Sequence, residues 1–275
     1  MNPAPYVGTY LNIPAFFADG SSTTIAIKNY LQDGKPDQSA RAQAAKGKLL
    51  AKISGELKKT PKGVFEMGGY EFCTLSIARV FMGKGAPDEI QDVLWLASRF
   101  NLIDSSTVRT YCDRNIGIDC GGFVANLWGI GHPENGRAVT GSTGFSPRSF
   151  WNFNKAKRRK HPGEISVGDA IIHFCHMPND DTDMASMDPK LGGEAFHIGT
   201  VAGITVKGDR IDLTVAESSG AKAASGGNGV SAYDKPDLAT KIAKNLVYVP
   251  SASGNRMYFV GKDGAMGSYM PFESY

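Results

Sequence analysis

The segment Gly117–Asn126 places a single cysteine, Cys120, where a helix is expected to begin. Gly121 and Gly122 let backbone or substrate approach closely, and the residues after them can continue as a helix with an apolar face. A thiol at a helix N-terminus lies near unpaired amide N–H groups and the positive end of the helix dipole, which favour its thiolate. Most cysteines are inert buried residues, but this context predicts Cys120 as a nucleophile whose neighbouring amides could bind an oxyanion.

Two further segments follow in a fixed order. Gly163–Phe174 contains the turn Gly168-Asp169 before an apolar strand pattern, and Gly193–Gly203 reads as a strand with His197 near its start. The order Asp-Cys-x-Gly-Phe-Val, Gly-Asp-x-Ile-x-x-Phe, His-Ile-Gly resembles the NlpC-type, papain-like cysteine peptidases and amidases, a CHAP-related family that cuts bacterial cell-wall peptides. The resemblance covers about residues 111 to 219, under half of the chain.

This resemblance implies a role for each matched residue. Cys120 would be the nucleophile and His197 the base that takes its proton and later protonates the leaving amine. Glu217, on the next expected strand, would orient His197. Tyr111, the only tyrosine in the thirty residues before Cys120, would polarise the scissile carbonyl. Asp119 is predicted to be the helix N-cap, because a catalytic carboxylate beside a thiolate would oppose its ionisation.

The sequence departs from the family pattern at two places. Gly121 follows the cysteine where serine is usual, and His173, Cys175 and His176 stand on a strand that normally carries plain hydrophobics. Either histidine could compete with His197 for the role of base. A zinc site is the alternative for these three residues, but His176 points to the opposite strand face from the other two, so no metal or other cofactor is predicted.

An acidic segment, residues 179–183 with Asp188, could take calcium. It lacks the glycine and the terminal glutamate of an EF-hand loop, so a solvated loop is predicted there.

Composition is that of a globular chain. Its 275 residues are 41% hydrophobic and 21% charged, with 33 glycines and a formal net charge of +3, which excludes wholesale disorder and does not indicate a nucleic-acid partner. The basic run at 155–161 is expected to be solvated surface, with anionic cell-wall polymers as an alternative partner. Besides Cys120, the cysteines Cys73, Cys112 and Cys175 permit at most one disulfide.

No classical signal peptide and no apolar run of membrane-spanning length is found in the sequence. A protein acting on cell wall would then need non-classical delivery, as a secretion-system effector or a phage lysin, or would have had its signal removed.

The elements expected to position the site form an α+β, papain-like fold, with the Cys120 helix packed on an antiparallel sheet. We expect a helical N-terminal extension over 1–105 and a catalytic domain over 106–275. The first 36 residues are expected to be largely irregular, and 129–162 a long loop with an aromatic patch at Phe145, Phe150, Trp151 and Phe153. The other expected elements are helices at 38–59, 70–82, 88–100 and 238–243, strands at 170–175, 197–204, 210–217, 245–249 and 256–260, and a flexible loop at 220–229.

The sequence therefore predicts a cysteine hydrolase that cleaves amide bonds in peptidoglycan stem peptides, with an immunity or inhibitor protein as a further possible partner. Two alternatives remain open. One is a papain-like acyltransferase or toxin effector that acts on a protein or lipid. The other is a wall-binding module that has lost catalysis.

Overall fold

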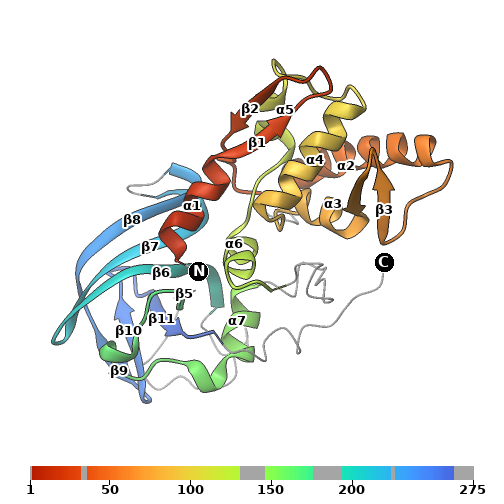
Figure 1. The fold of residues 1–275 in the computed structure, drawn as a ribbon. Helices are drawn as coiled ribbons and strands as arrows, with labels where there is room; N and C mark the ends of the chain where they lie inside the picture. The colour runs from red at the N-terminus through yellow and green to blue at the C-terminus, as the bar shows by residue number, and fades with distance from the viewer. Residues whose placement is uncertain (1, 32–35, 131–145, 176–193, 224–226, 263–275) are drawn as a thin grey trace.

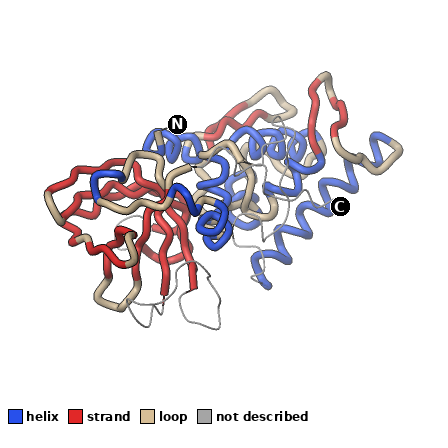
Figure 2. The backbone as a smooth tube through the Cα atoms, turned by 90° about the horizontal axis from the view of Figure 1, so that it is seen from below, coloured by secondary structure: helices blue, strands red, loops and turns tan. Residues whose placement is uncertain are grey.

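The computed structural model describes residues 2–31, 36–130, 146–175, 194–223 and 227–262. A seven-stranded antiparallel sheet occupies one end of the molecule, and most helices gather at the other (Figures 1 and 2). This arrangement agrees with the predicted α+β class. The strands, in the spatial order β8-β7-β6-β5-β11-β10-β9, are β5 (Ala170–Cys175), β6 (Glu194–Lys207), β7 (Arg210–Ala223), β8 (Gly227–Ala239), β9 (Lys241–Ala243), β10 (Leu246–Pro250) and β11 (Arg256–Val260).

The central strands bury both of their faces, since neighbouring side chains in a strand point to opposite sides. On β5, Ile172 belongs to the main core and Ile171 to a smaller second core. On β6 the corresponding residues are Ile198 and Val201. This explains why the sequence of β5 reads as a nearly continuous apolar run. A polar side chain in these strands therefore has to find a partner within the protein.

The helical end is built from two hairpins and the N-terminal helices. The main core includes residues from both sides of position 105, where the N-terminal extension was expected to end. Tyr10, Phe81 and Leu94 belong to the same buried cluster as Phe123 and Phe174. The elements are α1 (Pro3–Leu11), β1 (Ile13–Phe16), β2 (Ser22–Ile25), α2 (Pro36–Leu57), β3 (Val64–Met67), β4 (Tyr70–Cys73), α3 (Thr74–Val80), α4 (Pro87–Arg99), α5 (Val108–Asn115), α6 (Cys120–Leu127) and α7 (Pro147–Phe153), with short 3-10 turns at Lys155–Lys157 and Pro162–Glu164.

Two N-terminal expectations were wrong. Residues 3–11 form α1, because Pro3 suits the first helical turn and the Asn2 side chain accepts a hydrogen bond from the Ala4 amide at 3.1 Å. The helix expected from Tyr70 starts only at Thr74, since residues 70–73 are strand β4. Gly68 and Gly69 have φ of +62° and +81°, so they form the two-residue turn of a β-hairpin.

Three later expectations also need correction. The segment 220–229 was expected to be a flexible loop, but β7 extends to Ala223 and β8 begins at Gly227. Residues 238–243 are strand, not helix, because they extend β8 and form β9. The segment expected to be a long loop with an aromatic patch contains α7, in which Phe150 and Trp151 are fully buried and pack into the core. Trp151 meets Phe174 with ring centroids 5.1 Å apart. Phe145 lies outside the described residues.

All four cysteines have free thiols. Among the described residues, no helix is both long enough and apolar enough to cross a membrane.

Candidate active site

Cys120 is the first residue of α6, and Asp119 caps that helix as predicted. The Asp119 Oδ1 atom accepts a hydrogen bond from the Gly122 amide at 2.6 Å. Its other oxygen, Oδ2, pairs with the buried ammonium of Lys84. The cap is therefore neutralised by a partner that the sequence analysis did not identify. Asp119 holds the start of the helix, and its charge opposes ionisation of the neighbouring Cys120 thiol.

The loop that carries Gly83 and Lys84 packs closely against the start of α6. The Asp119 amide donates to the Gly83 carbonyl at 2.8 Å. A Cβ added at Gly122 would lie 2.5 Å from the same carbonyl oxygen, closer than real contacts allow. Gly122 is thus required by the approach of this loop, which fixes the position of the thiol-bearing turn.

His197 and Glu217 meet on adjacent strands, as predicted. The His197 Nε2 atom lies 2.9 Å from Glu217 Oε2. The Tyr233 hydroxyl, on β8, donates to the other carboxylate oxygen at 3.0 Å. Glu217 is buried, so its charge is satisfied by these partners in place of water. Because Nε2 is engaged by Glu217, Nδ1 is the ring nitrogen left for the hydrogen bond that joins His197 to Cys120.

The electrostatics of the three residues favour an ion pair. Burial opposes ionisation of the Cys120 thiol, but the hydrogen bond and the charge of His197 outweigh it, so the pKa of Cys120 is lowered. Burial also opposes the charged form of His197, yet its hydrogen bonds to Cys120 and Glu217 raise its pKa to about 10. Burial opposes the charged form of Glu217, but the hydrogen bond and the charge of His197 outweigh it and lower the pKa of Glu217. The arrangement is a thiolate and an imidazolium, with a carboxylate behind the imidazolium.

The tyrosine that reaches Cys120 is Tyr30, not Tyr111. The Tyr30 hydroxyl lies 3.6 Å from the Cys120 Sγ atom and is also hydrogen-bonded to the Cys120 backbone. Tyr111 is on α5, and its buried hydroxyl has no hydrogen-bond partner among the described residues. Burial raises the pKa of both phenols, so both keep their protons. Tyr30 stands 90 residues before Cys120 in the chain, and no spacing rule in the sequence indicated it.

Residues 26–31 carry Tyr30 past the segment that leads into α6. The Ile118 amide donates to the Asn29 carbonyl at 3.0 Å, and the Asn29 side chain donates to the Asp113 carbonyl at 2.6 Å. A Cβ at Gly117 would lie 2.6 Å from the Asn29 carbonyl oxygen. On the other side, the Ser218 hydroxyl donates to the Ile118 carbonyl at 2.6 Å. The cysteine loop is thus held between the N-terminal segment and strand β7.

His173 lies beside His197 and is not the residue bonded to Cys120. The two histidines are cross-strand partners on β5 and β6, and their ring centroids are 5.2 Å apart. The burial of His173 and the charge of His197 lower the pKa of His173 to about 3, so it is neutral. Cys175 is partly buried near the end of β5. His176 and the acidic segment at 179–188 lie outside the described residues.

Part of the basic run is committed to the fold. Arg159 pairs with Asp169 through two hydrogen bonds of 2.7 Å, which fixes the Gly168-Asp169 turn. The Arg158 guanidinium lies 3.8 Å from the centre of the Trp151 ring. Only the lysines of the run are left as candidates for contact with an anionic polymer.

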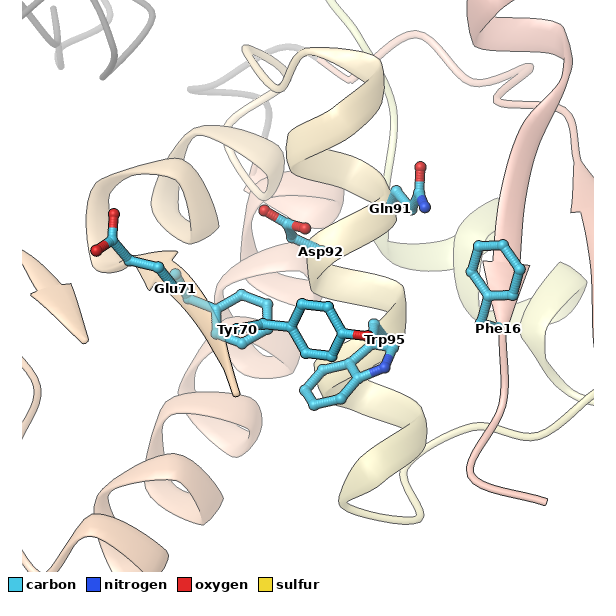
Figure 3. Close-up of a pocket in the computed structure, with 7 residues that line it drawn as sticks. Phe16, Tyr70, Glu71, Gln91, Asp92 and Trp95 are labelled. Atoms are coloured by element: carbon cyan, nitrogen blue, oxygen red, sulfur yellow. The ribbon is translucent and has the colours of Figure 1, made fainter. Parts of the chain in front are cut away.

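A cavity lies at the helical end of the molecule, apart from Cys120, His197 and Glu217. This cavity, of about 510 Å³, is lined by residues of α4, β1 and the β3-β4 hairpin. Figure 3 shows Tyr70 and Trp95 side by side, with Asp92 above them on α4 and Phe16 apart on β1. The Tyr70 and Trp95 rings meet edge to face at 5.4 Å between centroids. Cys120, His197 and Glu217 do not line this cavity.

Comparison with known protein families, curated proteins and solved structures finds no match to this chain.

Proposed function

We propose that this protein is a papain-like cysteine hydrolase that cleaves amide bonds in peptidoglycan stem peptides. The observation that carries the proposal is the set formed by Cys120, His197 and Glu217, with a lowered pKa on the thiol and a raised pKa on the imidazole. An ionised thiol at a helix N-terminus is the form that attacks carbonyl carbon. The choice of peptidoglycan rests on the sequence resemblance.

In the proposed acylation step, the Cys120 thiolate attacks the carbonyl carbon and the carbonyl oxygen becomes an oxyanion. The Cys120 amide and the Tyr30 hydroxyl, which lie together beside the thiol, would donate hydrogen bonds to that oxygen. Collapse of the tetrahedral intermediate breaks the C–N bond. The imidazolium of His197 gives its proton to the leaving amine, and a thioester remains on Cys120.

In the proposed deacylation step, neutral His197 removes a proton from water, and the resulting hydroxide attacks the thioester. The C–S bond breaks, the acid product leaves, and the thiolate pairs again with protonated His197. Glu217 would keep Nε2 protonated throughout, so that Nδ1 always faces the thiol and the water. Tyr233 would hold Glu217 in the orientation that this requires.

The test is digestion of purified peptidoglycan by the wild-type chain and by Cys120→Ala, with the released fragments identified by mass spectrometry. Release by the wild type alone would support the proposal, and the fragment masses would name the bond. If neither releases fragments while Cys120 reacts rapidly with iodoacetamide, the thiolate is active but peptidoglycan is the wrong substrate. Slow alkylation together with no release would instead indicate a module without catalysis.

A further inference from the structure

His173, His197 and Glu217 form a cluster whose possible ligand atoms all lie within 4.8 Å of one another. Three adjacent strands supply them: His173 from β5, His197 from β6 and Glu217 from β7. Each residue stands on a strand of the sheet, and His173 and His197 are direct cross-strand partners beside a register shift between His173 and Phe174. The cluster is therefore a fixed feature of the sheet and does not depend on a surface loop.

One polar atom of His173 is unsatisfied. Its Nε2 atom is buried and has no hydrogen-bond partner among the described residues. Buried polar atoms are normally paired, and each exception calls for an explanation such as a missing ligand. The proposed hydrolysis has no step for this residue.

We propose that His173, His197 and Glu217 bind a zinc ion, and that zinc in this position inhibits the enzyme. Two imidazoles and one glutamate are a ligand set that zinc takes in proteins, with water completing the tetrahedron. Magnesium and calcium prefer sites made of oxygen atoms alone, so this set selects against them. Zinc ligands at bond lengths of about 2.0–2.2 Å stand roughly 3.3 Å apart, so small side-chain rotations suffice to close the site.

Inhibition follows from the ring nitrogen that the metal would take, and this part rests on the proposed function. In the free enzyme, Nε2 of His197 is hydrogen-bonded to Glu217. Zinc at Nε2 would displace the proton there to solvent and leave the single remaining ring proton on Nδ1. The metal-bound imidazole, now neutral, would be a far weaker acid than the imidazolium, so it would not give its Nδ1 proton to the leaving amine. Nδ1 would also have no lone pair with which to take a proton from water. Removal of the metal would restore the base.

The first experiment measures binding itself and needs no substrate. The full chain, freed of metal with a chelator that is then removed, is titrated with ZnCl₂ in an isothermal calorimeter, with MgCl₂ as the hard-cation comparison. We expect one zinc per chain and no magnesium binding. His173→Leu should weaken zinc binding at least about tenfold, since even the loss of a group that only orients a metal ligand typically costs that much.

Two matched variants separate this site from other zinc ligands in the chain. His161→Leu removes an exposed histidine from a remote turn and should bind zinc like the wild type. Cys120→Ala, which is inactive under the proposed function, should also keep its zinc. Unchanged binding in His173→Leu, or loss of binding in Cys120→Ala, would overturn the proposed ligand set.

The second experiment addresses inhibition. Zinc at a concentration that saturates the calorimetric site should abolish hydrolysis, and the chelator should restore it. His173→Leu should stay active at that zinc concentration, because it lacks one zinc ligand and the proposed hydrolysis has no step for His173. Equal zinc sensitivity of the two proteins would refute inhibition through this site. If the wild type never hydrolyses peptidoglycan, the proposed function fails while the binding result still decides whether the metal site exists.

Discussion

The missing side chain of Gly199 makes room for Glu217. A Cβ built at Gly199 would lie 3.2 Å from Oε2 and 3.3 Å from Cβ of Glu217. Oε2 is also the atom bonded to His197. The glycine of the His-Ile-Gly motif is thus tied to the position of the carboxylate that orients the histidine.

Gly199→Ala should therefore impair catalysis without unfolding the protein. The added methyl group would push Glu217 by a few tenths of an ångström and lengthen its bond to His197. Small displacements of catalytic groups are costly, so we expect kcat to fall by about tenfold, with KM little changed. The measurement is steady-state hydrolysis of a stem peptide, with Gly163→Ala as the control because its added Cβ would meet nothing within 4 Å. Wild-type kcat in Gly199→Ala would contradict the role given to Glu217.

The pH profile should report the ion pair. The proposed hydrolysis requires a Cys120 thiolate and a protonated His197. The rate should rise as pH rises through the lowered pKa of Cys120, and it should fall as pH rises through the His197 pKa of about 10. Alkylation of Cys120 by iodoacetamide needs only the thiolate, so it should rise through the same acidic limb without the alkaline fall.

Glu217→Gln should move the alkaline limb in a predictable direction. The carboxylate helps to raise the pKa of His197, so its removal should lower that pKa and shift the fall in activity to lower pH. Both profiles are measured on the same peptide. An alkaline limb that stays in place would show that Glu217 does not set the protonation of His197.

Tyr30 and Tyr111 make a matched pair of tests. Tyr30→Phe removes a hydroxyl 3.6 Å from the Cys120 Sγ atom, and we expect kcat to fall by roughly 10²-fold, in the range typical of losing one oxyanion donor. Rapid alkylation of Cys120 should persist, since His197 still holds the thiolate. Tyr111→Phe removes a buried hydroxyl that has no partner among the described residues, so activity should be unchanged and stability equal or higher. Loss of activity in Tyr111→Phe but not in Tyr30→Phe would instead support Tyr111, the tyrosine predicted from the sequence.

The sequence predicted the positions of site residues that lie close together in the chain or on consecutive strands. It did not predict a site residue that is brought in by distant contacts. Asp119 and Cys120 are neighbours at a helix start, so capping rules predicted their geometry. His197 and Glu217 occupy adjacent strands joined by a hairpin, so the motif order placed them correctly. Tyr30 reaches Cys120 across 90 residues, through a segment positioned by backbone contacts that no periodicity encodes.

The errors in the fold have local causes. The helix expected at 70–82 follows the glycine pair Gly68 and Gly69, but a glycine pair between two short apolar stretches is also a hairpin signal. The aromatic residues of α7 were expected in a loop because glycine, serine and proline surround them. The prolines and serines there instead mark a short helix start, with Ser146 as the N-cap and Pro147 as the first helical residue.

Asp92 provides a test of the fold away from Cys120, His197 and Glu217. Burial, together with the nearby Asp88 and Glu89, raises its pKa to about 6, so its charged form is disfavoured in the folded state. The folded protein therefore binds more protons than the unfolded chain between about pH 4 and 6, and stability should fall as pH rises through that window. Asp92→Asn should be more stable than the wild type at pH 7.5 by roughly 0.5–1 kcal/mol, a figure discounted because the side chain is partly exposed. Urea unfolding at pH 4 and 7.5 tests this, and an equal gain at both would exclude the charge as its cause.

Replacing Lys84 alone should cost more stability than replacing Lys84 and Asp119 together. Both are buried, so Lys84→Met leaves the Asp119 carboxylate without its cation at the start of α6. Loss of one partner of a buried pair typically costs about 3–5 kcal/mol, and we expect Lys84→Met to lose stability in that range. Lys84→Met combined with Asp119→Asn keeps a side-chain oxygen for the Gly122 amide and removes the stranded charge, so it should recover much of the loss. Urea unfolding of the wild type, both single variants and the double variant gives the coupling energy. If the losses in the single variants simply added in the double variant, the ion pair would not be what holds the cysteine-bearing turn.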